Sequence, residues 1–245
     1  MEYYAKSPNS QRHRETVKEH LQNVAALARE YGEPLGLGEA AELAGRIHDF
    51  GKYSSAFQDV LKGLRTGIDH AIGGACFLEG CYRGNPGVRP VVEAVNGHHD
   101  GLVAYGEVKE ELNNMADDAK HVRANAGKAP SIEGAAQLTE AIRAFRRDFP
   151  DFKPPQLCPP PRTELESMLY TRMLFSCLVD ADYTDSAAND DVTYMETAKD
   201  DYFEPRSLLE NLYTYRDYIR QSSTADRTLN AYRNRVFEQC GRMGD

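Results

Sequence analysis

Residues 14–31, RETVKEHLQNVAALAREY, place apolar side chains three or four positions apart along the segment. This spacing is typical of a helix that buries one face. The same period recurs over residues 39–50, 90–97 and 163–182, and no segment shows the alternating pattern of a half-buried strand. The sequence therefore predicts an all-α fold, a compact helical bundle.

Capping and turn residues set the expected boundaries of the shorter helices. Gly51 is expected to end the helix over 39–50, and Ser54 to cap a short helix that follows it. Asp69 is expected to cap a helix that begins at His70. Four further amphipathic segments predict helices near 107–124 and 131–147, and two over 205–243 that break around 221–225.

A proline-rich segment divides the chain. Residues 150–161 hold six of the twelve prolines, which predicts an extended loop. It could be a mobile linker between domains or a structured crossover. We favour the crossover, because the next helix, opened by the capping box of Thr163 and Glu166, carries chemistry that completes an earlier site. The expectation is one domain over residues 1–245.

The charge balance excludes one class of protein. Lys and Arg number 29 against 38 Asp and Glu, for a formal charge of −9. A protein that grips nucleic acid through bulk positive charge is therefore excluded, although local basic patches remain possible. Two clusters are candidate phosphate contacts, with ordinary solvated helix faces as the alternative: Arg12, Arg14 and Lys18, and Arg143, Arg146 and Arg147.

Cysteine usage and hydropathy indicate a cytoplasmic location. The five cysteines are scattered without a C-x-x-C pair, which fits buried thiols in a reducing compartment better than a disulfide framework. Residues 1–15 lack the apolar stretch of a signal peptide. No apolar run approaches the ~20 residues of a membrane helix, so no membrane partner is expected.

Histidine and aspartate residues form the chemical signal of the sequence. His48 and Asp49 are adjacent, and Gly51 and Lys52 follow them. Imidazole and carboxylate together suit a divalent transition metal, and one carboxylate can bridge two ions. Lys52 could hold a substrate phosphate. A lone His-Asp pair at a helix end would be weak evidence for any of this.

The other histidines differ in what they indicate alone. His20 lies on the apolar stripe of its helix, where an ordinary core histidine is the alternative, and His70 could be a simple cap. The pair His98 and His99 follows a helix end, where packing gains little from two imidazoles, so metal binding is favoured.

A distal aspartate completes this set. Asp180 is expected at the end of a buried apolar helix, where an unpaired carboxylate would be costly, so a metal is one way to satisfy it. Other polar residues near the motifs are expected to cap helices, to support the ligands from behind, or to lie on the surface: His13, Asp69, Asp100, His121 and Asp182.

The order of these residues resembles the HD superfamily of metal-dependent phosphohydrolases. More narrowly, it resembles the HD nuclease domain of the CRISPR-associated nuclease-helicase of type I interference systems. The segments that carry the resemblance are VKEHLQNVAALA, IHDFGK, IDHAIGGA, VNGHHDGL and LFSCLVDADYTDS. It spans residues 13 to about 190, and the tail over about 225–245 is similar to the helix that leads into the helicase of such proteins.

The resemblance implies a metal site in the core of the bundle and a ligand set for two ions. One ion would be held by His20, His48, Asp49 and Asp180. The second would be held by Asp49, His70, His98 and His99. Asp49 would bridge the ions and Lys52 would assist the reaction at the substrate phosphate. Five imidazoles favour manganese, nickel, cobalt or iron, with magnesium possible.

The implied activity is hydrolysis of phosphodiester bonds in single-stranded DNA, with RNA as a further polymer. The implied partners are that strand, a helicase domain in the same chain or another, and a crRNA-guided CRISPR surveillance complex. Two alternatives remain open. One is an HD phosphohydrolase that acts on nucleotides or cyclic nucleotides, and the other is a non-catalytic HD scaffold.

Overall fold

The structure, a computed structural model, describes residues 2–9, 13–65, 70–83, 85–113, 133–157, 163–190, 205–223 and 226–243. Within these ranges the regular elements are helices, which confirms the all-α fold. Tyr4 and Thr16 add an isolated antiparallel bridge. None of the described helices combines the length and the apolar character needed to cross a membrane.

The chain divides into two compact units, Met1–Met195 and Glu196–Asp245. The expectation of one domain over residues 1–245, with about 225–245 leading toward a helicase domain, stays a prediction. The second unit holds α10 (Pro205–Ser222) and α11 (Arg227–Met243), with the expected break between them. The candidate histidine and aspartate residues named above lie in the first unit wherever the structure describes them. Asp69 and His121 lie outside the described residues.

The pair of helices α1 (Val17–Gly32) and α2 (Gly38–Ile47) forms the centre of the first unit. The predicted stripe of α1 is buried, and a capping box of Thr16 and Glu19 fixes its first turn. The 3₁₀ turn η1 (Glu33–Leu35) joins the two helices. They approach closely at Gly45, where an added Cβ would lie 2.8 Å from Ala25 Cα.

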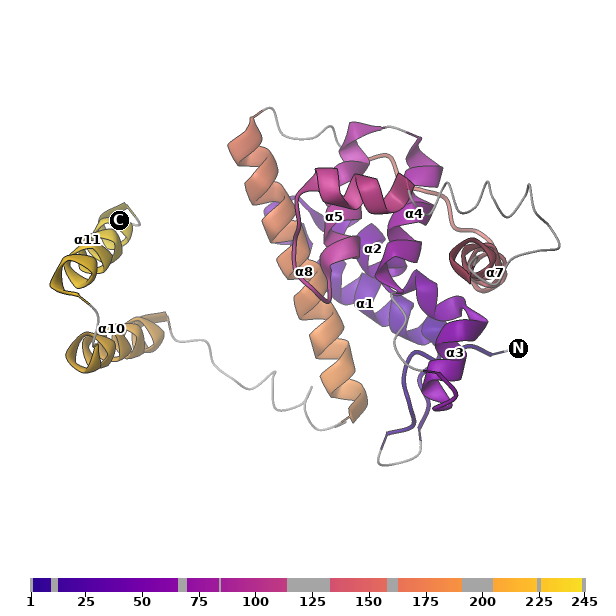
Figure 1. The fold of residues 1–245 in the computed structure, drawn as a ribbon, viewed down its shortest axis with the longest axis horizontal. Helices are drawn as coiled ribbons and strands as arrows, with labels where there is room; N and C mark the ends of the chain where they lie inside the picture. The colour runs from indigo at the N-terminus through magenta and orange to yellow at the C-terminus, as the bar shows by residue number, and fades with distance from the viewer. Residues whose placement is uncertain are drawn as a thin grey trace. The chain divides into compact units, whose positions relative to one another are not determined.

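The helix α8 (Glu164–Asp190) packs along α1, α2 and α5 (Arg89–Gly97), as the long orange helix of Figure 1 shows. The predicted capping box is present, with the backbone N–H of Glu166 donating to Thr163 Oγ1. The helix does not end at residue 182 as expected, but continues to Asp190. Its packing against α1 confirms that this segment shares a core with residues 17–47.

Short elements surround the carboxyl end of α2. This helix ends at Ile47 and not at Phe50, and the 3₁₀ turn η2 (Phe50–Tyr53) follows. Ser54 caps α3 (Ser55–Leu61) as predicted. Next come α4 (Ala71–Tyr82) and η3 (Pro86–Val88), while residues 105–113 form the described part of the helix predicted near 107–124.

Aromatic rings join α7 (Glu133–Asp148) to the rest of the first unit. Phe145 is fully buried, and its ring centroid lies 5.4 Å from those of both Phe50 and Phe77. It also contacts Phe149 and Phe152, which follow α7. This cluster holds η2, and with it the chain that follows Asp49, against α7.

Replacing Phe145 by alanine is therefore expected to destabilise the first unit by about 3–5 kcal/mol, because a large buried ring leaves a cavity among rigid neighbours. Urea unfolding followed by circular dichroism measures the loss. Leu165→Ala, at a position of α8 that is 63% exposed, is the matched control and should change stability by less than about 0.5 kcal/mol. Equal losses in the two variants would contradict this packing.

Candidate metal centre

His48 and Asp49 lie directly after α2, at the centre of the first unit. Both side chains are buried, with exposed fractions of 0% and 1%. A carboxylate taken this far from water needs cations or hydrogen-bond donors around it. The packing of α1, α4, α5 and α8 around α2 brings those groups from distant parts of the sequence.

Gly51 explains one part of the His-Asp-x-Gly-Lys pattern. An added Cβ at this position would lie 2.2 Å from the backbone oxygen of His70, far inside any van der Waals contact. Glycine therefore lets the backbone that carries His70 lie directly against η2. Gly51, which the sequence predicts only as a helix end, is needed here because the backbones of η2 and His70 are in contact.

The two oxygens of Asp49 face different sets of imidazoles. Oδ2 lies 2.9 Å from His20 Nε2 and 3.3 Å from His48 Nε2. Oδ1 lies 3.1 Å from His70 Nε2 and 3.5 Å from His98 Nε2. This is the arrangement that a carboxylate needs in order to bridge two ions.

Two groups of candidate ligands meet at Asp49, and within each group the ligand atoms lie within 4.8 Å of one another. We name them by position. The inner group consists of His20, His48, Asp49 and Asp182, and the outer group consists of Asp49, His70, His98 and His99. The structure thus brings together six of the seven residues expected to bind metal.

Backbone carbonyls fix the tautomers of two histidines. His48 Nδ1 lies 2.9 Å from the carbonyl oxygen of Gly45, and His98 Nδ1 lies 2.7 Å from that of Val95. Because a carbonyl oxygen only accepts, each Nδ1 must donate its proton. The lone pair of each neutral ring is then on Nε2, which faces Asp49, as a metal ligand requires.

Unpaired buried atoms support a cation at this place. Among the described residues, the buried side-chain atoms without a hydrogen-bond partner include His48 Nε2, His98 Nε2 and Asp49 Oδ1. Buried polar atoms are normally paired, so three such atoms converging in one cluster need an explanation. Nitrogen and carboxylate donors of this kind suit a divalent transition metal.

The two carboxylates of the inner group are held in their charged form, which suits a cation. Lys52 Nζ lies 2.5 Å from Asp49 Oδ2 and is largely buried. Burial by itself would raise the pKa of Asp49, but the Lys52 ammonium and the neighbouring His48 hold that pKa well below its ordinary value. Burial acts on Asp182 in the same way, and the nearby imidazoles of His20 and His48 lower its pKa. Both carboxylates are thus ionised at neutral pH.

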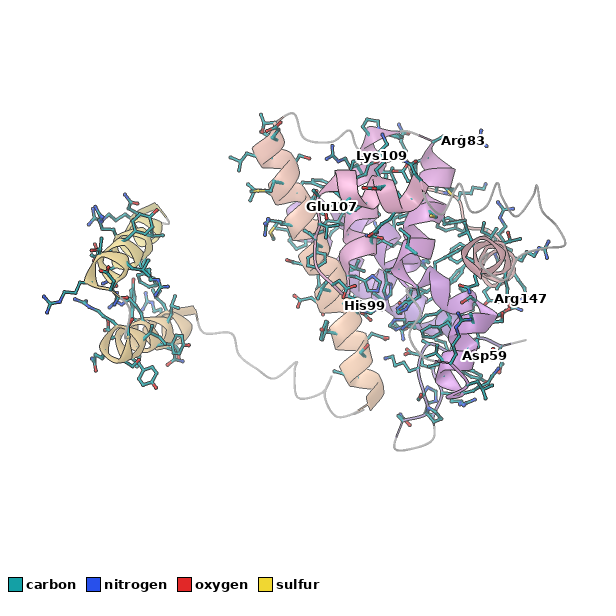
Figure 2. All side chains as sticks on the ribbon, in the orientation of Figure 1. Asp59, Arg83, His99, Glu107, Lys109 and Arg147 are labelled. Carbon is teal, nitrogen blue, oxygen red and sulfur yellow. The ribbon has the colours of Figure 1, made fainter. Side chains whose placement is uncertain are left out.

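The outer group forms the accessible edge of the cluster. His99, labelled in Figure 2, is exposed, and its Nε2 lies 2.7 Å from His70 Nε2. Desolvation and the adjacent imidazoles of His98 and His70 lower the pKa of His99 to about 4. The ring is neutral at physiological pH, with a lone pair available to a ligand.

The aspartate from α8 is Asp182, and the expectation of Asp180 is wrong for this structure. Since α8 continues to Asp190, Asp180 does not end a buried helix. It is exposed, whereas Asp182, about 200° further round the helix, lies 3.4 Å from His20 Nε2 and 3.7 Å from His48 Nε2. The sequence pattern alone predicts for Asp182 only a capping, supporting or surface role.

Two further acidic residues were missed. Asp185 Oδ2 lies 2.6 Å from His20 Nδ1, and Glu15 Oε2 lies 3.7 Å from the same atom. Both carboxylates are buried. The spacing of Asp182 and Asp185, three residues apart and so on one face of a helix, was the signal that could have identified the second.

Two of the basic residues considered as phosphate contacts have partners outside this centre. Arg147 contacts Asp148 and the ring of Tyr3, and Figure 2 shows it on α7, well separated from His99. Arg14 lies over the ring of Tyr4. Arg12 lies outside the described residues.

The choice between the two α8 aspartates gives a direct test. Asp182→Asn should weaken Mn²⁺ binding at least tenfold, because it removes a charged ligand of the inner group. Asp180→Asn is the matched control on the same helix and should bind Mn²⁺ as the parent does. Isothermal titration calorimetry measures the Mn²⁺ affinity of both variants. Weakened binding in Asp180→Asn with unchanged binding in Asp182→Asn would restore Asp180 as the ligand.

Comparison with known proteins agrees with this geometry. The model of the HD domain family matches residues 17–148, more than half of the chain, and no match was found among curated proteins. The matched segment includes both His48–Asp49 and the outer group, while Asp182 and Asp185 lie beyond it on α8. The protein therefore belongs to the HD domain family, which indicates a metal-dependent phosphohydrolase.

Proposed function

We propose that the protein is a divalent-metal-dependent nuclease that hydrolyses phosphodiester bonds of single-stranded DNA. The observation that carries the proposal is the position of Asp49, whose two oxygens face the inner and outer groups separately. A shared carboxylate between two ligand sets is the arrangement of two-metal phosphoryl-transfer sites. The imidazole-rich donor set favours manganese, cobalt, nickel or iron over magnesium.

The residues of the centre have distinct roles in this proposal. Two bound ions would supply an acidified water and stabilise the charge that develops on the phosphate oxygens. Asp49 holds the two ligand sets together, and Asp182 adds the second carboxylate of the inner group. Lys52 pairs with Asp49 in this structure. We propose that, when substrate binds, the Lys52 ammonium contacts a phosphate oxygen of the substrate instead.

The substrate approaches from the outer group. His20 and His48 have no exposed surface, whereas His99 is exposed and His70 retains 14% of its side-chain surface. A phosphodiester can therefore reach the outer ligands and Lys52 without opening the helical core.

The choice of single-stranded DNA, and of CRISPR type I interference as the context, rests on the resemblance of the motifs quoted above. In that context a helicase domain, in this chain or another, feeds the strand, and a crRNA-guided complex recruits the enzyme. The place of action is the cytoplasm. Free thiols at Cys76, Cys81 and Cys177 support a reducing compartment.

Two substitutions separate the proposed roles. Asp49→Ala should abolish metal binding at both groups and with it cleavage. Lys52→Ala should bind Mn²⁺ at least as well as the parent, because the ammonium no longer competes for Asp49. It should still cleave about a hundredfold more slowly, since a charged donor at the phosphate is worth ~2–4 kcal/mol.

The assay uses circular single-stranded DNA and a panel of divalent metals, with metal stoichiometry measured on the same preparations. Nucleoside triphosphates and cyclic dinucleotides, supplied in parallel, test the small-molecule alternative. Cleavage of the circle by the parent and by Asp49→Ala alike would refute the two-metal nuclease. Turnover of free nucleotides without cleavage of the circle would reassign the substrate, and metal binding without any turnover would indicate a scaffold.

A further inference from the structure

His20 differs from the other buried histidines of the centre in the hydrogen-bond partner of its Nδ1 atom. His48 and His98 donate Nδ1–H to backbone carbonyls. Nδ1 of His20 faces the carboxylate of Asp185 at 2.6 Å, with Glu15 at 3.7 Å. A carboxylate hydrogen-bonded to one nitrogen of a histidine ligand fixes the tautomer and the ring orientation. It also makes the opposite nitrogen more basic, and so a stronger metal ligand.

The helix α8 places Asp185 for this contact. Asp182 and Asp185 lie three residues apart on the face of α8 that packs against α1. The first contacts His20 Nε2 and the second contacts Nδ1, so one helix turn holds both edges of the ring. Asp185 is only 6% exposed, which strengthens a charge-assisted hydrogen bond.

Residues before α1 place Glu15. The backbone N–H of Ala5 donates to the carbonyl oxygen of Glu15 at 2.9 Å, and Lys6 Nζ lies 3.2 Å from the Glu15 carboxylate. The ammonium offsets part of the repulsion between Glu15 and Asp185, which share one small region around Nδ1. Glu15, Lys6 and Asp185 all lie outside the segment that matches the HD domain family.

The two ligand groups are consequently unequal. The inner group has two carboxylates, Asp49 and Asp182, and a histidine backed by a third. The outer group has no carboxylate except the shared Asp49, and one of its imidazoles, His99, is exposed. The greater negative charge of the inner group, and the carboxylate behind His20, favour retention of a dication there.

We propose that Asp185, supported by Glu15 and Lys6, is a positioning residue that fixes His20 as a ligand and makes the inner group the tighter of two metal sites. The outer group then binds the more readily exchanged ion. This inference rests on the proposed two-metal function.

The test is a Mn²⁺ titration of the full chain, followed by calorimetry, with Co²⁺ absorption spectra as a signature of ligand geometry. The parent should bind in two steps of different affinity. Asp185→Asn keeps the size of the side chain and removes its charge, so the tighter step should weaken by about 10–100-fold. The weaker step should not change, and the Co²⁺ band of the tighter site should shift.

Asp180→Asn, on the exposed face of the same helix, is the matched control and should reproduce the parent titration. If circular dichroism shows that Asp185→Asn does not fold, Asp185→Ser makes the same test with a smaller side chain. Two unaltered steps in a folded Asp185 variant would overturn the inference while leaving the two-metal function intact. A parent that binds no metal would refute the proposed function itself.

Discussion

The burial of the Asp49 carboxylate is the constraint on which the rest of the first unit depends. A charge with 1% exposure at the centre of a helical bundle would be strongly destabilising without partners. The structure surrounds it with four imidazoles and one ammonium, delivered by α1, the end of α2, η2, the start of α4 and the end of α5. The fold is thus arranged around one acidic residue, and the proposed chemistry uses the same contacts.

Close backbone approach is what allows so many elements to meet there. Gly45 admits α1 against α2, and Gly51 admits the backbone of His70 against η2. Gly74 in α4 has the same role, since an added Cβ would lie 2.5 Å from the carbonyl oxygen of Ile47. The small residues beside the histidine motifs are therefore part of the metal centre, because they set the distances between its ligands.

Periodicity predicted the all-α fold and most helix positions. The resemblance to the HD superfamily implied that six residues belong to one site, and the structure places them close together: His20, His48, Asp49, His70, His98 and His99. The error at Asp180 has a physical cause. A helix assumed to end at residue 182 would leave Asp180 in its last buried turn, but α8 continues to Asp190. Two residues correspond to more than half a turn of helix, so Asp180 lies on the exposed side of α8 while Asp182, one turn after the buried Leu178, faces the centre. The three-residue spacing from Asp182 was the sequence signal for Asp185, whereas Glu15 had none, because its role depends on which ring nitrogen of His20 faces it.

The central claim is that Asp49 joins two metal sites. Anomalous diffraction from crystals of the full chain loaded with Mn²⁺ tests it most directly. We predict two manganese peaks about 3.5–4 Å apart, one beside each carboxylate oxygen of Asp49. The inner peak should be coordinated by His20, His48 and Asp182, and the outer one by His70, His98 and His99. A single peak, or peaks that do not contact Asp49, at saturating Mn²⁺ would contradict the account.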